Sequence, residues 1–207
     1  MKMSDKRKRT NLSTITQIAL FSALLCIISP FAIVFPFSPV PVSLSTLMLY
    51  LSVYILGMRN AVISCGIYLL IGSVGIPVFS GFTGGIGKVL GPTGGYLIGY
   101  LFLVFISGWF VEKWSLGNAQ NAICGSNNYD NGKFYIKYIV QGLGMILGTV
   151  VCYLFGSVWI AYQAGMDFLV ALGIGTIPFI PGDVLKIFIG IFAGNAVRRR
   201  LIKAGMI

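Results

Sequence analysis

The stretch AVISCGIYLLIGSVGIPV, from Ala61 to Val78, is eighteen residues long and carries no charged side chain. A transmembrane helix needs about 20 predominantly apolar residues, so we expect this stretch to cross a membrane and to end near Pro77. The following stretch SGFTGGIGKVLGP, from Ser80 to Pro92, is dense in glycine, which disfavours a stable lipid-facing helix. Because non-helical backbone at membrane depth is tolerated only where it is buried or lines a cavity, we interpret this segment as a candidate lid.

Composition extends this interpretation to the whole chain. Of its 207 residues, 57% are hydrophobic and only 10% are charged, whereas about 25% are charged in an ordinary soluble domain. The sequence therefore predicts an all-α, polytopic membrane protein with one integral membrane domain, residues 1–207, and no room for a second, soluble domain. A basic segment, residues 1–14, precedes the first span, which is too long for a signal-peptide core. The six expected spans are residues 15–37, 44–56, 61–78, 93–111, 134–162 and 181–197.

The connections and the orientation follow from the polar residues. We expect a tight turn at Gly57 to Asn60, a flexible loop over residues 112–133, and a short outer helix or connection from Asp167 to Ile177. In this arrangement thirteen of the fifteen Lys and Arg residues lie on one side. Positive residues mark the cytoplasmic side, so both termini are expected in the cytoplasm and the glycine-rich segment is expected to be an outer loop between the third and fourth spans.

Several functions are excluded at this stage. The net charge of +10 comes from basic residues at the ends of apolar runs, which does not indicate a nucleic-acid surface. There is no His, and the four Cys are scattered singly, so we expect no metal site and no cofactor. No Walker A pattern or nucleophile elbow is present. We therefore expect no enzymatic activity, and any uptake would draw on an ion gradient or a separate ATPase.

Two ionisable residues in the last span are the strongest site candidates. Asp183 and Lys186 are three residues apart, which places them on one face of a helix. Charged groups inside a membrane are costly and usually functional. Asp183 can accept hydrogen bonds from a ligand's N–H groups, and Lys186 can donate to a carboxylate or carbonyl oxygen. The alternative is structural, with Asp183 favouring the helix N-terminus and Lys186 pairing with it or extending outward.

Other candidates carry weaker signals. Lys88 lies in the glycine-rich segment, where a solvated Lys is the ordinary interpretation. Phe82 and Tyr96 lie near predicted outer ends of spans, where they either belong to an interfacial aromatic belt or stack against a flat ligand. Ala19 and Ala23 form a small-residue stripe on the first helix, which either packs within the bundle or contacts a partner helix.

Two motifs resemble a known family. The run GIPVFSG from Gly75 to Gly81, continuing through Gly84 and Gly85 to GPTGGY, which ends at Tyr96, is similar to the BioY family of biotin transporters. The stretch PGDVLK, residues 181–186, resembles that family's last-helix signature, and the similarity covers nearly the whole chain. The resemblance implies a six-helix, biotin-binding S component of an energy-coupling-factor (ECF) transporter in a prokaryotic plasma membrane, with its site near the outer surface.

The resemblance also implies roles for particular residues. Asp183 and Lys186 match biotin-contacting positions, and Ala19 and Ala23 match an Ala-x-x-x-Ala contact with the transmembrane coupling subunit. We count further candidate substrate-binding residues in the loop and at its border, namely Lys88, Gly84, Gly85, Phe82 and Tyr96. In the implied mechanism biotin binds from outside, the glycine-rich loop closes, and partner ATPase subunits drive a reorientation in the lipid bilayer.

Three alternatives remain open from the sequence. The first is an S component for another vitamin or a metal, which would carry different polar groups at the site. The second is a membrane-embedded enzyme that uses Asp183 as a general base, for which only Lys186 or Lys88 could be the second catalytic group. The third is a structural membrane subunit without a ligand.

Overall fold

A computed structural model describes residues 2–33, 42–123 and 131–203 of the chain. The described residues form seven α-helices, one short 3₁₀-helix and two strands of two residues each. In chain order these are α1 (Lys2–Ile28), β1 (Ala32–Ile33), β2 (Val42–Ser43), α2 (Ser45–Ser73), α3 (Ile86–Leu90), α4 (Gly94–Ile123), α5 (Asn131–Ala164), α6 (Phe168–Gly175), η1 (Ile177–Phe179) and α7 (Ile180–Lys203). The strands pair antiparallel and join the end of α1 to the start of α2.

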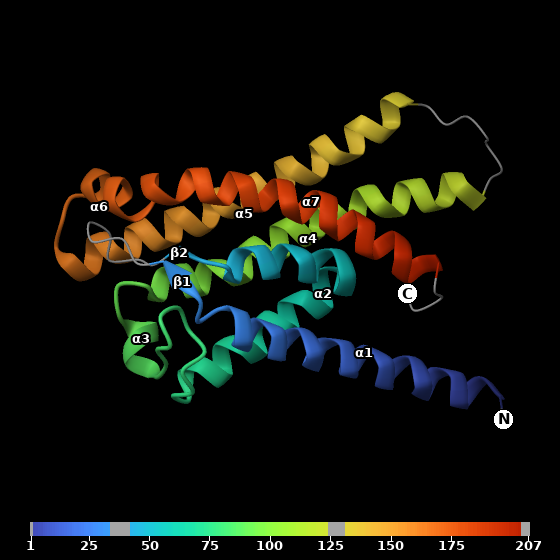
Figure 1. Ribbon diagram of the computed structural model, residues 1–207, viewed down its shortest axis with the longest axis horizontal. Helices are drawn as coiled ribbons and strands as arrows, with labels where there is room; N and C mark the ends of the chain where they lie inside the picture. Colours follow the sequence, from blue (N-terminus) through green and yellow to red (C-terminus); the bar gives the residue numbers. More distant parts are fainter. Residues whose placement is uncertain (1, 34–41, 124–130, 204–207) are drawn as a thin grey trace.

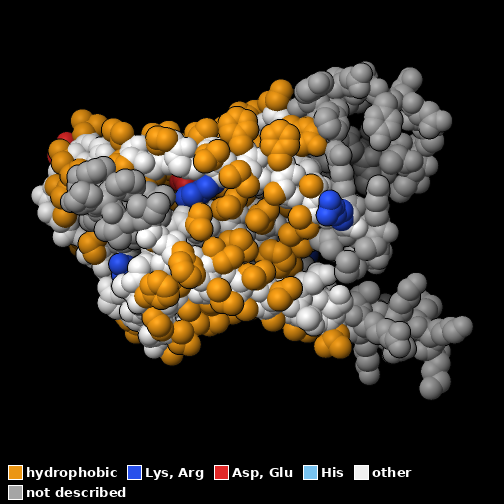
Figure 2. All heavy atoms as spheres, in the orientation of Figure 1, with side chains coloured by type: hydrophobic (Ala, Val, Ile, Leu, Met, Phe, Trp, Pro, Cys, Tyr) orange, Lys and Arg blue, Asp and Glu red, His pale blue; other side chains and the backbone are white. Residues whose placement is uncertain are grey.

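The chain is a multi-pass membrane protein built from long apolar helices. Among the described residues, four helical segments are long and apolar enough to cross a membrane, and a shorter apolar helix covers Leu12–Ile28. The four segments are Ser45–Ser73, Gly94–Lys113, Tyr138–Ala164 and Phe168–Arg198. Hydrophobic side chains cover most of the middle of the face seen in Figure 2, with few charges among them. Such a surface suits contact with hydrocarbon, because lipid tails are as apolar as these side chains.

Helix α2 is folded into two arms at Gly57. This residue has φ 78° and ψ 173° and interrupts the helix, and the two arms run in opposite directions (Figure 1). A Cβ at Gly57 would lie 2.6 Å from Glu112 Oε1, which accepts a hydrogen bond from the Met58 N–H at 2.6 Å. The chain therefore turns at Gly57, the first residue of the predicted turn, and residues 58–60 are already helical. When the arms are counted separately, the described residues contain six long helical segments, which agrees in number with the six predicted spans.

Two segments differ from the ranges expected from the sequence. Within the first expected span, residues 15–37, the helix ends at Ile28, because Pro30 disfavours helical backbone at the residue before it. The end of the first predicted span and most of the connection between the first two spans lie outside the described residues. The loop predicted over residues 112–133 is also shorter, since α4 continues to Ile123 and α5 begins at Asn131. Residues 112–123 include Glu, Lys, Leu, Gln and Ala, which favour helix, and no Pro.

The glycine-rich segment, residues 80–92, and the residues 75–79 before it form a set of turns followed by the short helix α3. Phe79 and Thr83 bond to each other's backbone, the Gly81 N–H donates to the Pro30 carbonyl at 2.9 Å, and the Gly85 N–H donates to the Gly72 carbonyl at 2.7 Å. The Phe79 ring packs on the bare backbone of Gly72, where a Cβ would lie 2.1 Å from it. The segment is thus fixed to the ends of α1 and α2. It lies with α6 and the strands at one end of the molecule, opposite the start of α1 and the end of α7 (Figure 1).

Candidate functional site

Asp183 and Lys186 form a buried ion pair near the start of α7. Lys186 Nζ lies 2.8 Å from Asp183 Oδ1. Only 5% of Asp183 and 8% of Lys186 is exposed. The helical spacing predicted that the two side chains share a face, and the structure confirms that arrangement. A buried pair of this kind balances two charges that would each be costly alone in a low-dielectric interior.

The ammonium of Lys186 uses all three of its donors. Besides Asp183, it donates to the Ser43 carbonyl at 2.7 Å and to Thr46 Oγ1 at 3.2 Å. Both acceptors belong to the start of the first arm of α2 and the strand before it. Lys186 therefore ties α7 to the β2–α2 junction, and its hydrogen-bonding capacity is filled within the protein.

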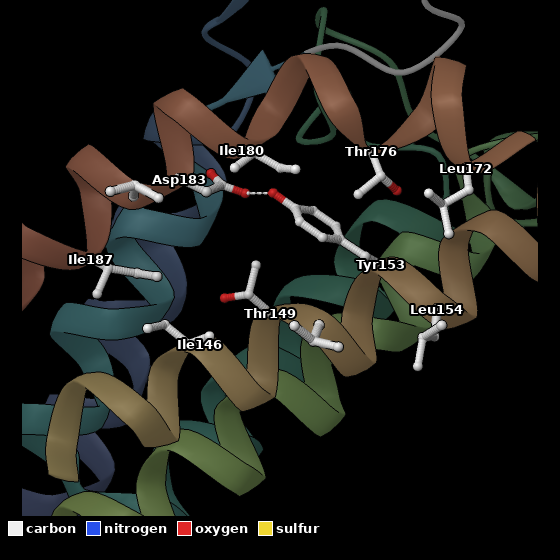
Figure 3. Close-up of a pocket in the computed structure, with 11 residues that line it drawn as sticks. Ile146, Thr149, Tyr153, Leu154, Leu172, Thr176, Ile180, Asp183 and Ile187 are labelled. Carbon is white, nitrogen blue, oxygen red and sulfur yellow. Dashed lines mark hydrogen bonds between the residues drawn. The ribbon is translucent and has the colours of Figure 1, made fainter.

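The carboxylate of Asp183 joins three helices. Oδ1 also accepts from the Thr46 hydroxyl at 3.3 Å, and Oδ2 accepts from the Tyr153 hydroxyl at 2.5 Å. Figure 3 shows Tyr153 reaching from α5 toward Asp183 on α7, with the two side chains joined by this bond. Among the described residues, Oδ2 accepts one hydrogen bond and Oδ1 accepts two. Since a carboxylate has about four acceptor positions, Oδ2 keeps capacity for a ligand.

Two cavities meet at these residues. The polar cavity has a volume of about 40 Å³ and is lined by Ser43, Thr46, Tyr96, Tyr100, Leu103, Thr149, Cys152, Tyr153, Phe179, Asp183 and Lys186. The side cavity has a volume of about 300 Å³ and is lined by Ile146, Thr149, Val150, Tyr153, Leu154, Leu172, Thr176, Ile180, Asp183, Val184 and Ile187 (Figure 3). A volume of about 40 Å³ holds a water molecule, whereas small-molecule pockets occupy roughly 300–1,000 Å³. Only the side cavity therefore has the volume for an organic ligand.

Asp183 and Lys186 differ in the cavities that they line. Asp183, Thr149 and Tyr153 line both cavities, whereas Lys186 lines the polar cavity alone. The carboxylate thus lies at the boundary between a hydroxyl-rich space and an apolar one. Lys186 stands behind it, on the polar side.

Tyr96 lines the polar cavity, and a substrate contact by it stays a prediction. Its ring packs on Gly156, where a Cβ would lie 2.3 Å from the ring atoms. Its hydroxyl donates to the Gly175 carbonyl at 2.7 Å. Tyr96 therefore connects α4 with α5 and with the end of α6.

The remaining loop candidates lie apart from the ion pair. Among the described residues that line the two cavities, none is Lys88, Gly84, Gly85 or Phe82. Phe82 is 62% exposed and meets Phe31 edge to face, with ring centroids 5.5 Å apart. Lys88 is half-buried in α3. A substrate contact by these four residues stays a prediction.

Several residues of the site were not singled out in the sequence. Thr46, Thr149 and Tyr153 are polar residues inside apolar helices, and Thr149 and Tyr153 share a face of α5 through their spacing of four. Thr149 Oγ1 also bonds to the Tyr50 hydroxyl at 2.5 Å. The available signal was a hydroxyl within a span, but hydroxyl groups in spans also serve helix packing. Thr46 and Tyr153 are distinguished by their hydrogen bonds to Asp183, and Thr149 by lining both cavities. These relations exist only in three dimensions.

Ala19 and Ala23 lie on an exposed face of α1. They line a groove of about 420 Å³ between α1 and the second arm of α2. The groove is formed by Ile15, Ile18, Ala19, Ser22, Ala23, Ile63, Ile67 and Ile71. The small side chains therefore leave the backbone of α1 open to close approach by another helix.

Comparison with known proteins gives a consistent result. A profile of the BioY family matches residues 3–203. The biotin transporter BioY2 of Lactococcus lactis subsp. cremoris is 32% identical over 196 residues, which are 94% of each chain. The biotin transporter BioY of Rhizobium etli is 33% identical over 182 residues, 86% of this chain and 89% of that one.

A solved structure is also similar to this chain. It is the S-component for biotin from an ECF-type ABC transporter, with a TM-score of 0.75, 28% identity, and coverage of 92% of this chain and 93% of that one. The fold and the matched length agree across these comparisons. The chain therefore belongs to the BioY family.

Proposed function

We propose that this chain is the biotin-binding S component of an ECF-type transporter, and that separate ATPase subunits energise uptake. Its family membership and its likeness to a biotin S-component support this function. The observation that carries the proposal is the position of the Asp183 carboxylate, buried and held by Lys186 at the mouth of an apolar cavity of about 300 Å³. A site of this kind suits a small molecule with one polar end and an apolar body.

Biotin has the matching chemistry. Its ureido ring carries N–H donors, its body is apolar, and its tail ends in a carboxylate. Asp183 Oδ2 faces the side cavity and has room for further donors, so we place the ureido N–H groups there. Lys186 already has three acceptors, and its role is to orient Asp183 and to balance its charge. The aliphatic part of the ligand would lie against the side chains of α5 and α7.

We also propose a change at Tyr153 on binding. Its hydroxyl takes one of the acceptor positions of Asp183 Oδ2, and its side chain lines both cavities. We propose that Tyr153 rotates away from Asp183 as the ureido group arrives, so that one donor replaces another. The carboxylate then keeps its hydrogen bonds throughout, which avoids the cost of an unpaired buried charge.

The membrane placement is also proposed. The six spans cross a prokaryotic plasma membrane with both ends of the described chain in the cytoplasm. The excess of Lys and Arg at the connections on that side supports this orientation. The glycine-rich segment and the ion pair then lie toward the outer surface, from which biotin enters.

We assign the exposed face around Ala19 and Ala23 to the transmembrane coupling subunit, which links the S component to its ATPase subunits. The open groove beside these residues supports a close helix contact. We further propose that the glycine-rich segment closes over bound biotin and that Lys88, Gly84, Gly85 and Phe82 reach the ligand only then. If so, Lys88→Met weakens biotin binding although Lys88 lies outside both cavities.

The test is calorimetric titration of the purified chain with biotin. We expect tight binding that is lost in Asp183→Asn and strongly reduced in Lys186→Met. The matched controls are Asp167→Asn and Lys113→Met, both at exposed positions outside the site, and these should bind as the original chain does. A folded chain that binds no biotin would overturn the assignment, and a panel of other vitamins and metal ions would then identify the ligand class.

A further inference from the structure

A chain of buried hydroxyl groups leads from the glycine-rich segment to Lys186. Ser29 Oγ lies 2.5 Å from the Tyr68 hydroxyl and 2.5 Å from Ser45 Oγ. Ser45 Oγ in turn lies 2.8 Å from Ser43 Oγ. The carbonyl of that same Ser43 accepts from Lys186 Nζ at 2.7 Å. The contacts therefore continue without a gap from the second arm of α2 to the ion pair.

This hydroxyl chain, Tyr68–Ser29–Ser45–Ser43, is enclosed in the protein. Ser29 and Ser45 are fully buried, Tyr68 is 1% exposed and Ser43 is 6% exposed. Water is therefore largely excluded as a substitute partner, and each hydroxyl depends on its neighbour. A buried hydroxyl that loses its partner costs more than an exposed one, so the orientations along the chain are coupled.

The far end of the chain lies where the glycine-rich segment is anchored. The Tyr68 ring meets Phe79 edge to face, with centroids 5.6 Å apart. Ser29 immediately precedes Pro30, whose carbonyl accepts the Gly81 N–H. A movement of the segment would thus shift Phe79 and Pro30 and, through them, both Tyr68 and Ser29.

We propose that Tyr68, Ser29, Ser45 and Ser43 are positioning residues for the ligand site, which hold Lys186 in place and couple its position to that of the glycine-rich segment. This rests on the proposed function in that the ligand is taken to be biotin. None of the four lines the side cavity in which the ligand is placed, and only Ser43 lines the polar cavity. When the Asp183–Lys186 pair adjusts to a ligand, the Ser43 carbonyl moves with Lys186, and the hydroxyl chain transmits the shift to Phe79 and Gly81.

The test uses two variants with matched controls on the same helix. Ser45→Ala and Tyr68→Phe each break the chain. Ser52→Ala and Tyr54→Phe remove equally buried hydroxyls of α2 that bond elsewhere, to the Leu49 carbonyl and to Gln141 Oε1. We expect the first two to weaken biotin binding about fivefold, the effect of one net hydrogen bond, and the controls to leave the affinity unchanged.

Two further readouts separate positioning from general loss of packing. The double variant of Ser45 and Tyr68 should bind no more weakly than Ser45→Ala alone, because both changes break one chain. Hydrogen exchange should show that biotin protects the amides of Phe79, Gly81 and Gly85 in the original chain, and that saturating biotin no longer does so in Ser45→Ala. Three results would overturn the proposal. They are losses of biotin affinity that add in the double variant, equal losses of affinity in the controls, and amides in Ser45→Ala that biotin protects as well as in the original chain.

Hydrogen exchange also distinguishes failure of the ligand assignment from failure of the coupling. If the original chain binds no biotin, the proposed function fails, but the coupling can be measured without any ligand. Lys186→Met should then speed amide exchange at Gly81 and Gly85 in the original background and should have no such effect in Ser45→Ala. An equal effect in both backgrounds would overturn the coupling itself.

Discussion

Replacing Lys186 with Met tests how the ion pair contributes to the stability of the fold. Methionine keeps an unbranched side chain but has no ammonium. Three acceptors then lose their donor, namely Asp183 Oδ1, the Ser43 carbonyl and Thr46 Oγ1. The main effect falls on Asp183, which is 5% exposed and would be left as a buried carboxylate without a counter-charge.

The magnitude follows from the cost of breaking a buried pair. Removing one partner of such a pair destabilises a protein by about 3–5 kcal/mol. For a chain of 150–250 residues, 1 kcal/mol shifts the melting temperature by about 2–4 °C. We therefore expect Lys186→Met to melt roughly 6–20 °C below the original chain, by the product of these two ranges.

Thermal unfolding in one detergent, followed by size-exclusion chromatography of the heated samples, measures this shift. The double variant Asp183→Asn with Lys186→Met removes both charges and should recover much of the loss, because no unpaired charge remains. Lys113→Met, at an exposed Lys whose ammonium lies 4.6 Å from the Trp109 ring centroid, is the control. Two results would refute the reasoning. One is a melting temperature of Lys186→Met within about 2 °C of the original chain. The other is a double variant whose melting temperature falls by as much as the two single variants combined.

Three further changes have defined outcomes. Gly57→Ala should lower the free energy of unfolding by about 1–3 kcal/mol, measured by thermal unfolding, because φ 78° with ψ 173° is a conformation that glycine alone adopts readily and a Cβ would meet Glu112. Tyr153→Phe should destabilise the unliganded chain by about 1.5–3 kcal/mol through loss of a hydrogen bond to a charged group, seen in the same assay. Ala19→Leu combined with Ala23→Leu should abolish co-purification with the coupling subunit while calorimetry shows unchanged biotin affinity, and retained co-purification would contradict that interface.

The helices and the ion pair could be predicted because their signals are local. A run such as 61–78 is apolar over nearly a membrane thickness, and Asp183 and Lys186 are close in the chain, so helix geometry alone brings them together. The bend in α2 could also be predicted, since Gly57 begins a short polar interruption between two apolar runs. In each case the physical cause lies within a few residues.

The helix ends were harder to predict because hydrophobicity does not determine where a helix stops. The apolar run that begins at Ile15 continues past Pro30, yet the backbone leaves the helix at Ile28. Polarity likewise suggested a loop after Glu112, where helix propensity keeps α4 helical to Ile123. Composition identifies what can lie in the bilayer, whereas backbone conformation follows propensity and proline.

The site walls could not be predicted, because they depend on how the helices rotate and pack. Thr46 reaches Asp183 across 137 residues of sequence and Tyr153 does so across 30. Each is one hydroxyl among many in apolar helices, and only the packed bundle selects it. The same holds for Ser29, Ser43 and Ser45, which resemble ordinary small packing residues in the sequence.

The contacts of the ion pair also bear on which ligand the site can accept. Lys186 has three acceptors, and Asp183 has Lys186, Thr46 and Tyr153 as donors, so neither charge is left unpaired. If the ligand binds at Asp183 as proposed, it gains little from Lys186, whose acceptors are already in place, and it gains most by donating to Asp183 Oδ2 in place of the Tyr153 hydroxyl. A ligand that moved Tyr153 aside without offering a donor would leave the carboxylate short of a partner, which is costly in a buried site. Selection for a donor-bearing ring therefore follows from the hydrogen bonds of Asp183 as much as from the shape of the cavity.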